Sequence, residues 1–423
     1  GDRRPRTVPS GFGGRVKDAQ EWRDWLALTL QQPGDGHPGL RWQPLLPFGR
    51  RQLYCLRDVD RLPELAYLLR SRGRRWLARS AWHIVRLGLS WPRGEAMMTA
   101  AESDVLRQVL PAASGASPAL IQFGSPGPFQ KVVVVSTSAA GRVWVSKIAF
   151  QPGADDLVAR EASWLTRLGR VAELRGSVPE LVLAGRLTTG RRFLTMPAAS
   201  PLASPSGLGP AHRQFLEQLC RVSVRECSWE ETPLRQRLHE RFRHLTCELA
   251  PSVLAGPLAC WERIDSELRG KVVPTCIGHG DFAPWNINGG AHGVTVFDWE
   301  YAEDSVTPLH DFFHFQCMQR VLVSRCKLRG QWLESLLEAA RLHLRFVLPT
   351  SAFPAGQIES MFALYLLDTL SLYIEASGEV DAEHRVIREY VRCLSALHPR
   401  RSIRVGGCQQ PRGEIPHALV HRR

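Results

Sequence analysis

One segment in the second half of the chain restricts what this sequence can fold into more than any other. Residues 276–300 read CIGHGDFAPWNINGGAHGVTVFDWE. Apolar stretches before and after the turn-forming run 289–293 predict a β-hairpin. If the hairpin is centred near His292, Asn286 and Asp298 lie opposite each other, with their Cβ atoms roughly 5 Å apart. One turn would then bring together two oxygen-bearing side chains that can hold a hard divalent cation.

A carboxylate precedes this pair, in the order His-Gly-Asp-x-x-x-x-Asn. In phosphoryl transfer from a nucleotide, a metal ion neutralises the phosphate oxygens, while a nearby carboxylate orients the attacking hydroxyl and accepts its proton. The spacing therefore predicts Asp281 as the base, with Asn286 and Asp298 as ligands of Mg²⁺. The structural alternative is that Asp281 is a turn residue and Asp298 a strand-end cap, because Asp and Asn are common in turns.

The segment resembles the catalytic loop and the metal-binding strand of the aminoglycoside phosphotransferase and choline kinase family, which is related to the protein kinases. That family commonly has His-Gly-Asp, an Asn five residues after the Asp, and a hydrophobic strand ending in Asp-Trp-Glu, as found here at 298–300. By this resemblance, which covers about residues 118–395, His279 orients the catalytic loop. The chain departs from the pattern at 282–285, Phe-Ala-Pro-Trp, where relatives often have Leu-His-Pro-Gly, and this difference alters what contacts the acceptor.

The resemblance implies an α+β fold, bilobal and protein-kinase-like, with an antiparallel-sheet N-lobe, a mostly helical C-lobe and an N-terminal extension. It also implies an enzyme that uses ATP or GTP with Mg²⁺ to phosphorylate a hydroxyl group of a small molecule. The expected regions are an N-terminal extension at 1–112, partly helical and basic, a nucleotide-binding N-lobe at 113–197, a catalytic and acceptor-binding C-lobe at 198–400, and a disordered tail at 401–423.

Within the expected N-lobe, three short apolar stretches between positions 119 and 148 predict an antiparallel meander. By the resemblance, Gly124 and Gly127 in its first turn let backbone N–H groups approach the phosphates of the nucleotide. Lys147, near the end of the third strand, would contact the same phosphates with its charge. An ordinary hairpin turn and a solvated strand-end lysine are the structural alternatives.

A helix is predicted over residues 155–168, because apolar residues recur there at helical spacing. In the family pattern a helix glutamate pairs with the strand lysine, which makes Glu161 the candidate, and a solvated helix glutamate is the alternative. Two further strand candidates end at a Pro- and Ser-rich stretch that marks the boundary between the lobes. By the resemblance, backbone groups near Thr195 and Met196 meet the adenine edge.

The composition favours a soluble globular protein, with 44% hydrophobic and 22% charged residues. The formal net charge is +13, but only five of the 54 basic residues are lysine. This excess of arginine is attributed to the coding bias of a GC-rich genome, and no nucleic-acid binding is expected. The ten cysteines contain no Cys-x-x-Cys pair, so reduced thiols in a cytoplasm are the simplest account. Neither a signal peptide nor an apolar run long enough for a membrane span is predicted.

The expected extension contains a basic amphipathic stretch at 64–91. This stretch predicts either peripheral contact with an anionic membrane, at its inner surface, or packing against the lobes with a solvated arginine face, and packing is favoured. A catalytically weak, pseudokinase-like module that docks a membrane or protein partner through this stretch is the alternative to an enzyme. The oligomeric state stays open.

Two further patterns bear on the chemistry. His310 and His314 have the spacing by which a zinc protease helix holds its metal, but Asp311 stands where glutamate is usual, and no third ligand is evident. The resemblance instead gives Asp311 a structural task, that of accepting hydrogen bonds that set the catalytic loop. Glu303 and Asp304 would attract a cationic aminoglycoside or amine, or are solvated loop charges. The basic N-terminal stretch favours an anionic or envelope-linked sugar, so a sugar or envelope-precursor kinase is preferred to a resistance enzyme.

Overall fold

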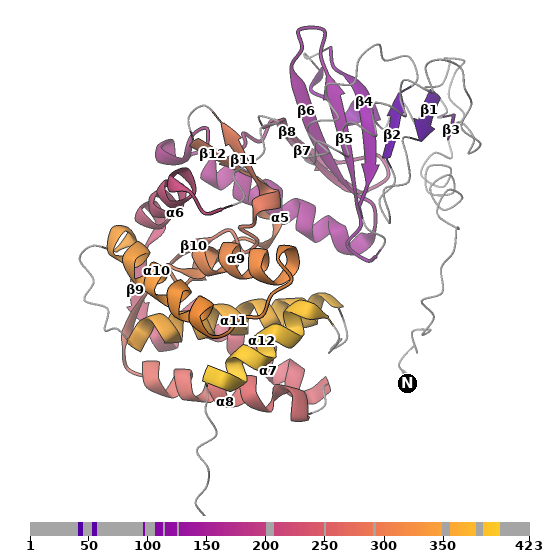
Figure 1. Cartoon of the computed structure of the whole chain (residues 1–423). Helices are drawn as coiled ribbons and strands as arrows, with labels where there is room; N and C mark the ends of the chain where they lie inside the picture. Colours follow the sequence, from indigo (N-terminus) through magenta and orange to yellow (C-terminus); the bar gives the residue numbers. More distant parts are fainter. Residues whose placement is uncertain are drawn as a thin grey trace, which may run out of the picture.

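A computed structural model describes residues 41–44, 53–56, 96–97, 106–112, 115–124, 127–199, 207–248, 251–290, 293–348, 356–377 and 384–397. These residues form two lobes, a sheet-rich N-terminal lobe and a larger helical C-terminal lobe (Figure 1). The predicted α+β, bilobal architecture is therefore confirmed. The predictions for residues 64–91 and 401–423 lie outside the described residues.

The N-terminal lobe is built on an antiparallel sheet of eight strands in the order β3-β1-β2-β4-β5-β6-β8-β7. The strands are β1 (Arg41–Pro44), β2 (Leu53–Leu56), β3 (Ala96–Met97), β4 (Ser117–Phe123), β5 (Lys131–Thr137), β6 (Val143–Ala149), β7 (Leu183–Arg186) and β8 (Arg192–Pro197). The predicted meander is confirmed as β4, β5 and β6, which pair in sequence. The sheet is wider than predicted, because β2 from the expected extension pairs with β4.

Alternation along the central strands gives the sheet two different faces. On β5, Val132 and Val134 are buried in an apolar cluster on one face. Lys131 and Val133 therefore point to the opposite face, and the ladder places Lys147 of β6 directly across from Val133. The two lysines thus extend from the same face as diagonal neighbours.

The helix α5 (Pro152–Leu168) packs on this second face, and its sequence explains why it forms. Proline suits the first turn, where its missing N–H would have no intrahelical partner, and Asp155 complements the positive end of the helix dipole. Buried residues recur every three or four positions, and Glu161 is among them. Because a buried carboxylate is costly unless it is paired, Glu161 requires a cationic partner on the sheet.

The C-terminal lobe surrounds a small antiparallel sheet with helices. Its helices are α6 (Pro210–Ser223), α7 (Pro233–Glu248), α8 (Pro251–Leu268), α9 (His310–Met318), α10 (Gln331–Val347), α11 (Gly356–Ser377) and α12 (Arg385–Leu397). Its strands are β9 (Arg225–Ser228), β10 (Val272–Gly278) and β13 (Glu303–Val306), with β10 in the middle, and a separate hairpin of β11 (Ile287–Gly290) and β12 (Gly293–Val296). Figure 1 shows this hairpin on the side of the lobe that faces the N-terminal sheet.

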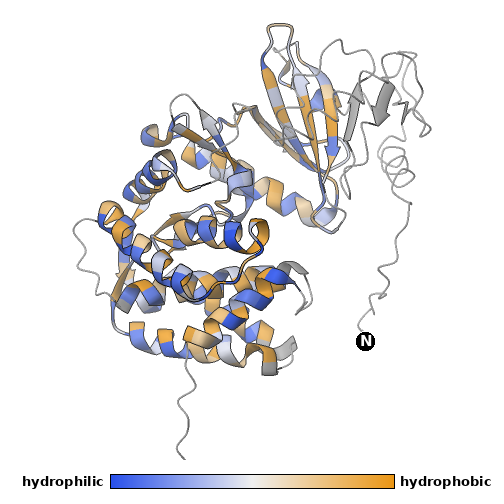
Figure 2. Cartoon of the chain, in the orientation of Figure 1, coloured by the Kyte–Doolittle hydropathy of each residue, from blue (hydrophilic) through white to orange (hydrophobic). Residues whose placement is uncertain are grey.

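The distribution of apolar residues explains how the helices pack. Almost every residue of α11 between positions 358 and 374 is buried, so this helix forms the centre of the lobe. Figure 2 shows hydrophobic residues along β4, β5 and β6, and mixed hydrophobic and hydrophilic stretches along the C-terminal helices. Among the described residues, no helix combines the length and the apolar character that a membrane crossing requires.

His343 of α10 is expected to make the stability of the C-terminal lobe depend on pH. His343 is 4% exposed and its ring stacks on Phe312, and its Nε2 has no hydrogen-bond partner within the part of the chain that the structure describes. Burial, with a smaller contribution from Arg213, lowers the pKa of His343 to about 4. Because the unfolded histidine has a pKa of about 6.5, unfolding takes up a proton between these values, and the free energy of unfolding should fall by about 3 kcal/mol as the pH drops through that window.

Urea titrations of the wild type and His343→Phe at several pH values between 4 and 7 would check this expectation. Phenylalanine keeps the ring stack but cannot take up a proton, so the variant should lack this part of the pH dependence. Parallel curves for the two proteins would contradict the assignment to His343.

Candidate active site

The strand β10 leads into a loop that Asp311 of α9 holds in place. The carboxylate of Asp311 accepts the backbone N–H of His279 at 2.7 Å and that of Gly280 at 3.2 Å. Gly280 has φ +79, and a Cβ there would lie 2.2 Å from the backbone oxygen of Tyr301, so only glycine fits. Burial alone would raise the pKa of Asp311, but hydrogen bonds from His310 and from the loop backbone hold it below its usual range.

His279 is a buried histidine that connects this loop to the end of β12. Its Nδ1 accepts the backbone N–H of Asp281 at 3.2 Å, and its Nε2 lies 3.1 Å from the backbone oxygen of Phe297. This pairing assigns the ring proton to Nε2. Burial lowers the pKa of His279 despite the carboxylates nearby, and the ring lies edge-on to Trp299. Both ring nitrogens are thus engaged in holding the backbone.

Asp281 presents its carboxylate between two hydrogen-bond partners. Its Oδ2 accepts from Nδ2 of Asn286 at 2.7 Å, and its Oδ1 lies 3.0 Å from Nε2 of His314. The side chain is 27% exposed, so the carboxylate remains accessible from outside. The sequence pattern suggests His314 only as a zinc ligand. Its place three residues after Asp311, on the same face of α9, is the signal that could have indicated a contact with the loop.

The ring nitrogens of His310 and His314 in α9 do not point toward a common metal position. The Nδ1 of His310 lies 3.4 Å from Asp311 and its Nε2 lies 3.6 Å from Asp368, whereas His314 contacts Asp281. Each imidazole is therefore occupied by a different carboxylate, and the zinc interpretation of their spacing has no support in the geometry.

The hairpin forms where expected, but its register differs by one residue from the prediction. Its last pair is Gly290 with Gly293, so that Phe297 faces Asn286 and donates its N–H to the Asn286 carbonyl at 3.0 Å. The prediction that Asn286 and Asp298 lie directly opposite each other is wrong. The predicted register would leave three residues between the last paired residues, whereas the structure leaves two. A two-residue connection is the preferred length for a hairpin. Asp298 follows one position later, in a left-handed backbone conformation with φ 75.

Lys147 of β6 connects the two lobes through carboxylates. Its Nζ lies 2.6 and 2.7 Å from the oxygens of Glu161 and 2.7 Å from Oδ1 of Asp298. Burial alone would lower the pKa of Lys147, but the carboxylates of Asp298, Glu161 and Glu300 raise it. Burial would likewise raise the pKa of Asp298, but Lys147 and Lys131 hold it well below its usual range. The Lys147 ammonium and the Asp298 carboxylate therefore stay charged at neutral pH.

Lys131 and Glu300 form a second ion pair beside the first. Glu300 lies in the short 3-10 helix η5 (Trp299–Tyr301), and burial, together with the carboxylate of Asp298, raises its pKa to about 7. Oxygens of Glu161, Asp298 and Glu300 lie within 4.8 Å of one another, the one such acidic cluster found among the described residues. Such a set of carboxylate oxygens fits a hard divalent cation. Sequence reasoning did not identify Lys131, although lysine is rare in this chain.

The remaining predicted residues, Gly124, Gly127 and Met196, lie in the turn before β5 and in β8. Gly124 donates its N–H to the backbone oxygen of Lys131 at 2.8 Å, and a Cβ on Gly124 would lie 3.1 Å from that oxygen. Gly127 has φ +151, which L side chains rarely adopt. Met196 of β8 is buried, and the ladder with β6 places it on the sheet face that carries Lys147. The glycines therefore shape the turn before β5. Met196 lies on the sheet face that α5 covers.

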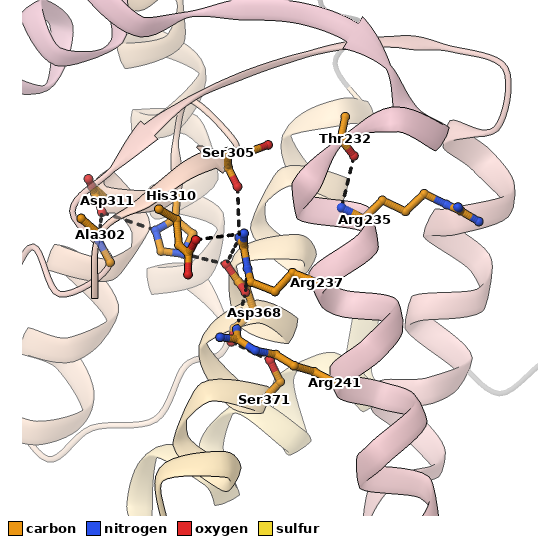
Figure 3. Close-up of polar contacts among 12 residues, drawn as sticks. Thr232, Arg235, Arg237, Arg241, Ala302, Ser305, His310, Asp311, Asp368 and Ser371 are labelled. Carbon is orange, nitrogen blue, oxygen red and sulfur yellow. Dashed lines mark hydrogen bonds and ion pairs between the residues drawn. The ribbon is translucent and has the colours of Figure 1, made fainter. Parts of the chain in front are cut away.

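A pocket that is partly open to solvent lies beside the loop. Its lining includes Gly280, Tyr301, Arg160, Arg241, Asp368 and Thr369. Figure 3 shows Asp368 between Arg237 and Arg241, with His310 beside it.

The two acidic residues that line this cavity, Glu303 and Asp368, are paired with arginines. Asp368 contacts Arg237 at 3.0 Å and Arg241 at 2.9 Å. Glu303 contacts Arg160 at 2.6 Å. Asp304, which is 54% exposed, pairs with Arg167. Glu303 and Asp304, the two acids that follow the hairpin, are therefore each in an ion pair with an arginine.

Comparison with known proteins places these observations in context. The family model described as "Phosphotransferase enzyme family" matches residues 122–345. No curated protein sequence matches the chain.

Among solved structures, aminoglycoside phosphotransferase APH(4)-Ia is 14% identical, with a TM-score of 0.47 over 70% of this chain and 96% of that chain. Macrolide 2'-phosphotransferase type I is 19% identical, with a TM-score of 0.44 over 70% of this chain and 97% of that chain. Amicoumacin kinase hAmiN, in complex with AMP-PNP, Ca²⁺ and Ami, is 13% identical, with a TM-score of 0.43 over 65% of this chain and 88% of that chain.

Proposed function

The chain belongs to the phosphotransferase enzyme family, and we propose that it transfers the γ-phosphoryl group of ATP or GTP to a hydroxyl group of a small molecule. The observation that carries this proposal is a continuous chain of contacts across the cleft. Asp281 contacts Asn286, whose carbonyl accepts the N–H of the residue before Asp298, and Asp298 contacts Lys147, which is held by Glu161. The accessible carboxylate of Asp281 is thereby linked to Asp298, which suits a cation, and to Lys147, which suits phosphates.

Asp281 is the proposed base. Its two oxygens are held by Asn286 and His314, which restricts rotation of the carboxylate before any substrate arrives. A carboxylate held in this way can orient an attacking hydroxyl in line with the phosphate and accept its proton as the new bond forms. His279 has the positioning role, because both of its nitrogens already hold the backbone.

Asn286 and Asp298 are the proposed ligands of Mg²⁺. The amide nitrogen of Asn286 donates to Asp281, which leaves the amide oxygen as the donor atom for a cation. The clustered oxygens of Asp298, Glu161 and Glu300 support a hard cation at this place. Mg²⁺ supplies charge neutralisation to the phosphate groups when it is bound.

Lys147 is the proposed phosphate-binding group of the N-terminal lobe, and Glu161 fixes its direction through two short contacts. Gly124 and Gly127 would allow backbone N–H groups to approach the phosphates. Met196 lies on the same sheet face and would border the base of the nucleotide.

The acceptor is proposed to bind in the cavity beside Gly280. Because Glu303 and Asp368, the acids that line this cavity, are paired with arginines, the lining itself offers little uncompensated negative charge to a polycation. Hydroxyl-rich acceptors that are neutral or anionic fit such a lining better, since an anion can share the arginines. This supports a sugar or envelope-precursor kinase over an aminoglycoside kinase.

An assay of ADP or GDP release with sugars, sugar phosphates, amino alcohols and aminoglycosides as acceptors would test this function. Acceptor-dependent release is expected with Mg²⁺ and should fall roughly 10²-fold or more when EDTA removes the metal, because charge neutralisation by a metal is worth several kcal/mol. Neutral or anionic acceptors should give the higher kcat/KM. Turnover of aminoglycosides alone would overturn the proposed acceptor class. Nucleotide binding without turnover of any acceptor would favour the pseudokinase-like binding module.

A further inference from the structure

Lys131 enters the same cleft from a strand that the proposed mechanism does not use. It is the first residue of β5, directly after the glycine-containing turn, and its backbone oxygen accepts the N–H of Gly124 at 2.8 Å. The ladder of β5 with β6 places it on the sheet face of Lys147, as its diagonal neighbour. The backbone therefore fixes where the Lys131 side chain starts, at the base of the turn.

The Lys131 ammonium crosses the cleft to the carboxylate of Glu300 in the C-terminal lobe. The Lys131 side chain is only 17% exposed and that of Glu300 only 7%. Two of the five lysines in the chain thus meet one cluster of three carboxylates, Glu161, Asp298 and Glu300. The cluster retains one negative charge in excess of the lysines when all these groups are ionised.

This balance changes when a nucleoside triphosphate and a divalent cation enter. The carboxylates would hold the cation and be neutralised by it, and the phosphate oxygens would then compete with them for the lysines. Lys147 has two carboxylate partners that fix it, whereas the Lys131 side chain has one partner among the described residues, at the end of a long side chain. Lys131 can therefore exchange its partner with less disruption of the surrounding structure.

We propose that Lys131 is a second phosphate-binding lysine, whose ammonium exchanges the Glu300 carboxylate for phosphate oxygens of the bound nucleotide. The inference rests on the proposed function and extends it, because it assigns part of the nucleotide affinity to a residue outside the strand-lysine and helix-glutamate pair. An ion pair that only connects the lobes would instead contribute to stability and would not distinguish nucleotides by their phosphates.

The test compares the dissociation constants of non-hydrolysable triphosphates, AMP-PNP and its guanosine counterpart, with those of adenosine and guanosine, in the presence of Mg²⁺. Lys131→Met should weaken triphosphate binding roughly 10- to 100-fold, as expected for one charge-assisted hydrogen bond. It should change nucleoside binding less than about 2-fold, since the nucleoside has no phosphate. Lys271→Met is the matched control, because Lys271 is exposed beside β10 in the other lobe, and it should bind both ligands as the wild type does.

Several outcomes separate this inference from the proposed function. If the wild type binds the triphosphate and Lys131→Met binds it equally well, or loses affinity for nucleoside and triphosphate alike, the inference fails and the proposed function stands. If the wild type binds no nucleotide, both fail.

A second variant keeps the inference testable if Lys131→Met does not fold. Glu300→Gln releases the Lys131 ammonium from its partner, so triphosphate binding measured without added Mg²⁺ should tighten roughly 3- to 10-fold, because one competing carboxylate is lost. Unchanged or weaker binding by Glu300→Gln overturns the exchange of partners.

Discussion

Replacing Asp281 with asparagine is expected to lower kcat by roughly 10²- to 10⁴-fold, the range that a positioned general base contributes. The amide oxygen of the new asparagine can still accept from Asn286, so the loop should keep its conformation. What is lost is the group that takes the proton of the attacking hydroxyl. The affinity for nucleotide should stay close to that of the wild type, because Asp281 contacts neither Lys147 nor Asp298 among the described interactions.

Steady-state turnover and nucleotide titration on the same preparation would measure both quantities. Asp156→Asn provides a matched control, since it makes the same change at an exposed position of α5. If Asp281→Asn turned over substrate at the rate of the control, Asp281 could not be the base.

The second large effect concerns stability. It involves the ion pairs of Asp368 with Arg237 and Arg241, which Figure 3 shows. Asp368→Asn is expected to lower the free energy of unfolding by about 3 kcal/mol, because it leaves buried guanidinium groups without their shared countercharge. Arg237 keeps a contact with Glu303 at 3.4 Å and Arg241 one with Glu375 at 3.1 Å. These remaining contacts place the expected loss at the lower end of the range for a broken buried ion pair.

Urea-induced unfolding at neutral pH would measure this loss. Glu267→Gln is the control, because Glu267 forms an exposed pair with Arg263 at 2.7 Å and should cost less than about 1 kcal/mol. Burial alone would raise the pKa of Asp368, but Arg237 and Arg241 hold it well below its usual range. The contribution of ionised Asp368 to the free energy of unfolding is therefore present at neutral pH, and it disappears as the pH falls below roughly 4. Equal losses in the two variants would refute the importance of the buried network.

The parts of this molecule that could be predicted from sequence are those encoded in contiguous residues. Alternation and Gly-containing turns predict the strands β4 to β6, and helical periodicity predicts α5, because each pattern depends on one stretch of chain. The contact between Lys147 and Glu161 was expected from the family resemblance alone, and it joins a strand to the helix that follows it directly in the chain.

The hairpin register could not be predicted from local patterns, because it depends on which two residues form the last pair before the turn. Glycines at 289, 290 and 293 allow more than one closing pair, and apolar alternation does not distinguish them. The structure selects Gly290 with Gly293, and this moves Asp298 from a ladder position to the residue that follows β12.

The contacts missed from sequence join residues far apart in the chain. Lys131 and Glu300 are 169 positions apart, and His314 and Asp281 are 33 apart. Such pairs are decided by how the lobes and α9 pack, so nothing in either local pattern reveals them. The width of the N-terminal sheet has the same origin, because β2 reaches β4 across a long intervening stretch.

The left-handed backbone at Asp298 limits how this position can change by mutation. Asparagine and glycine tolerate that conformation at little cost, as aspartate does, whereas most other side chains are strained there by about 1–2 kcal/mol. Asparagine and glycine are therefore the substitutions best tolerated at position 298, and both keep the turn but carry no charge. Such a variant would keep the shape of the turn but lose the carboxylate that contacts Lys147 and that is the proposed cation ligand.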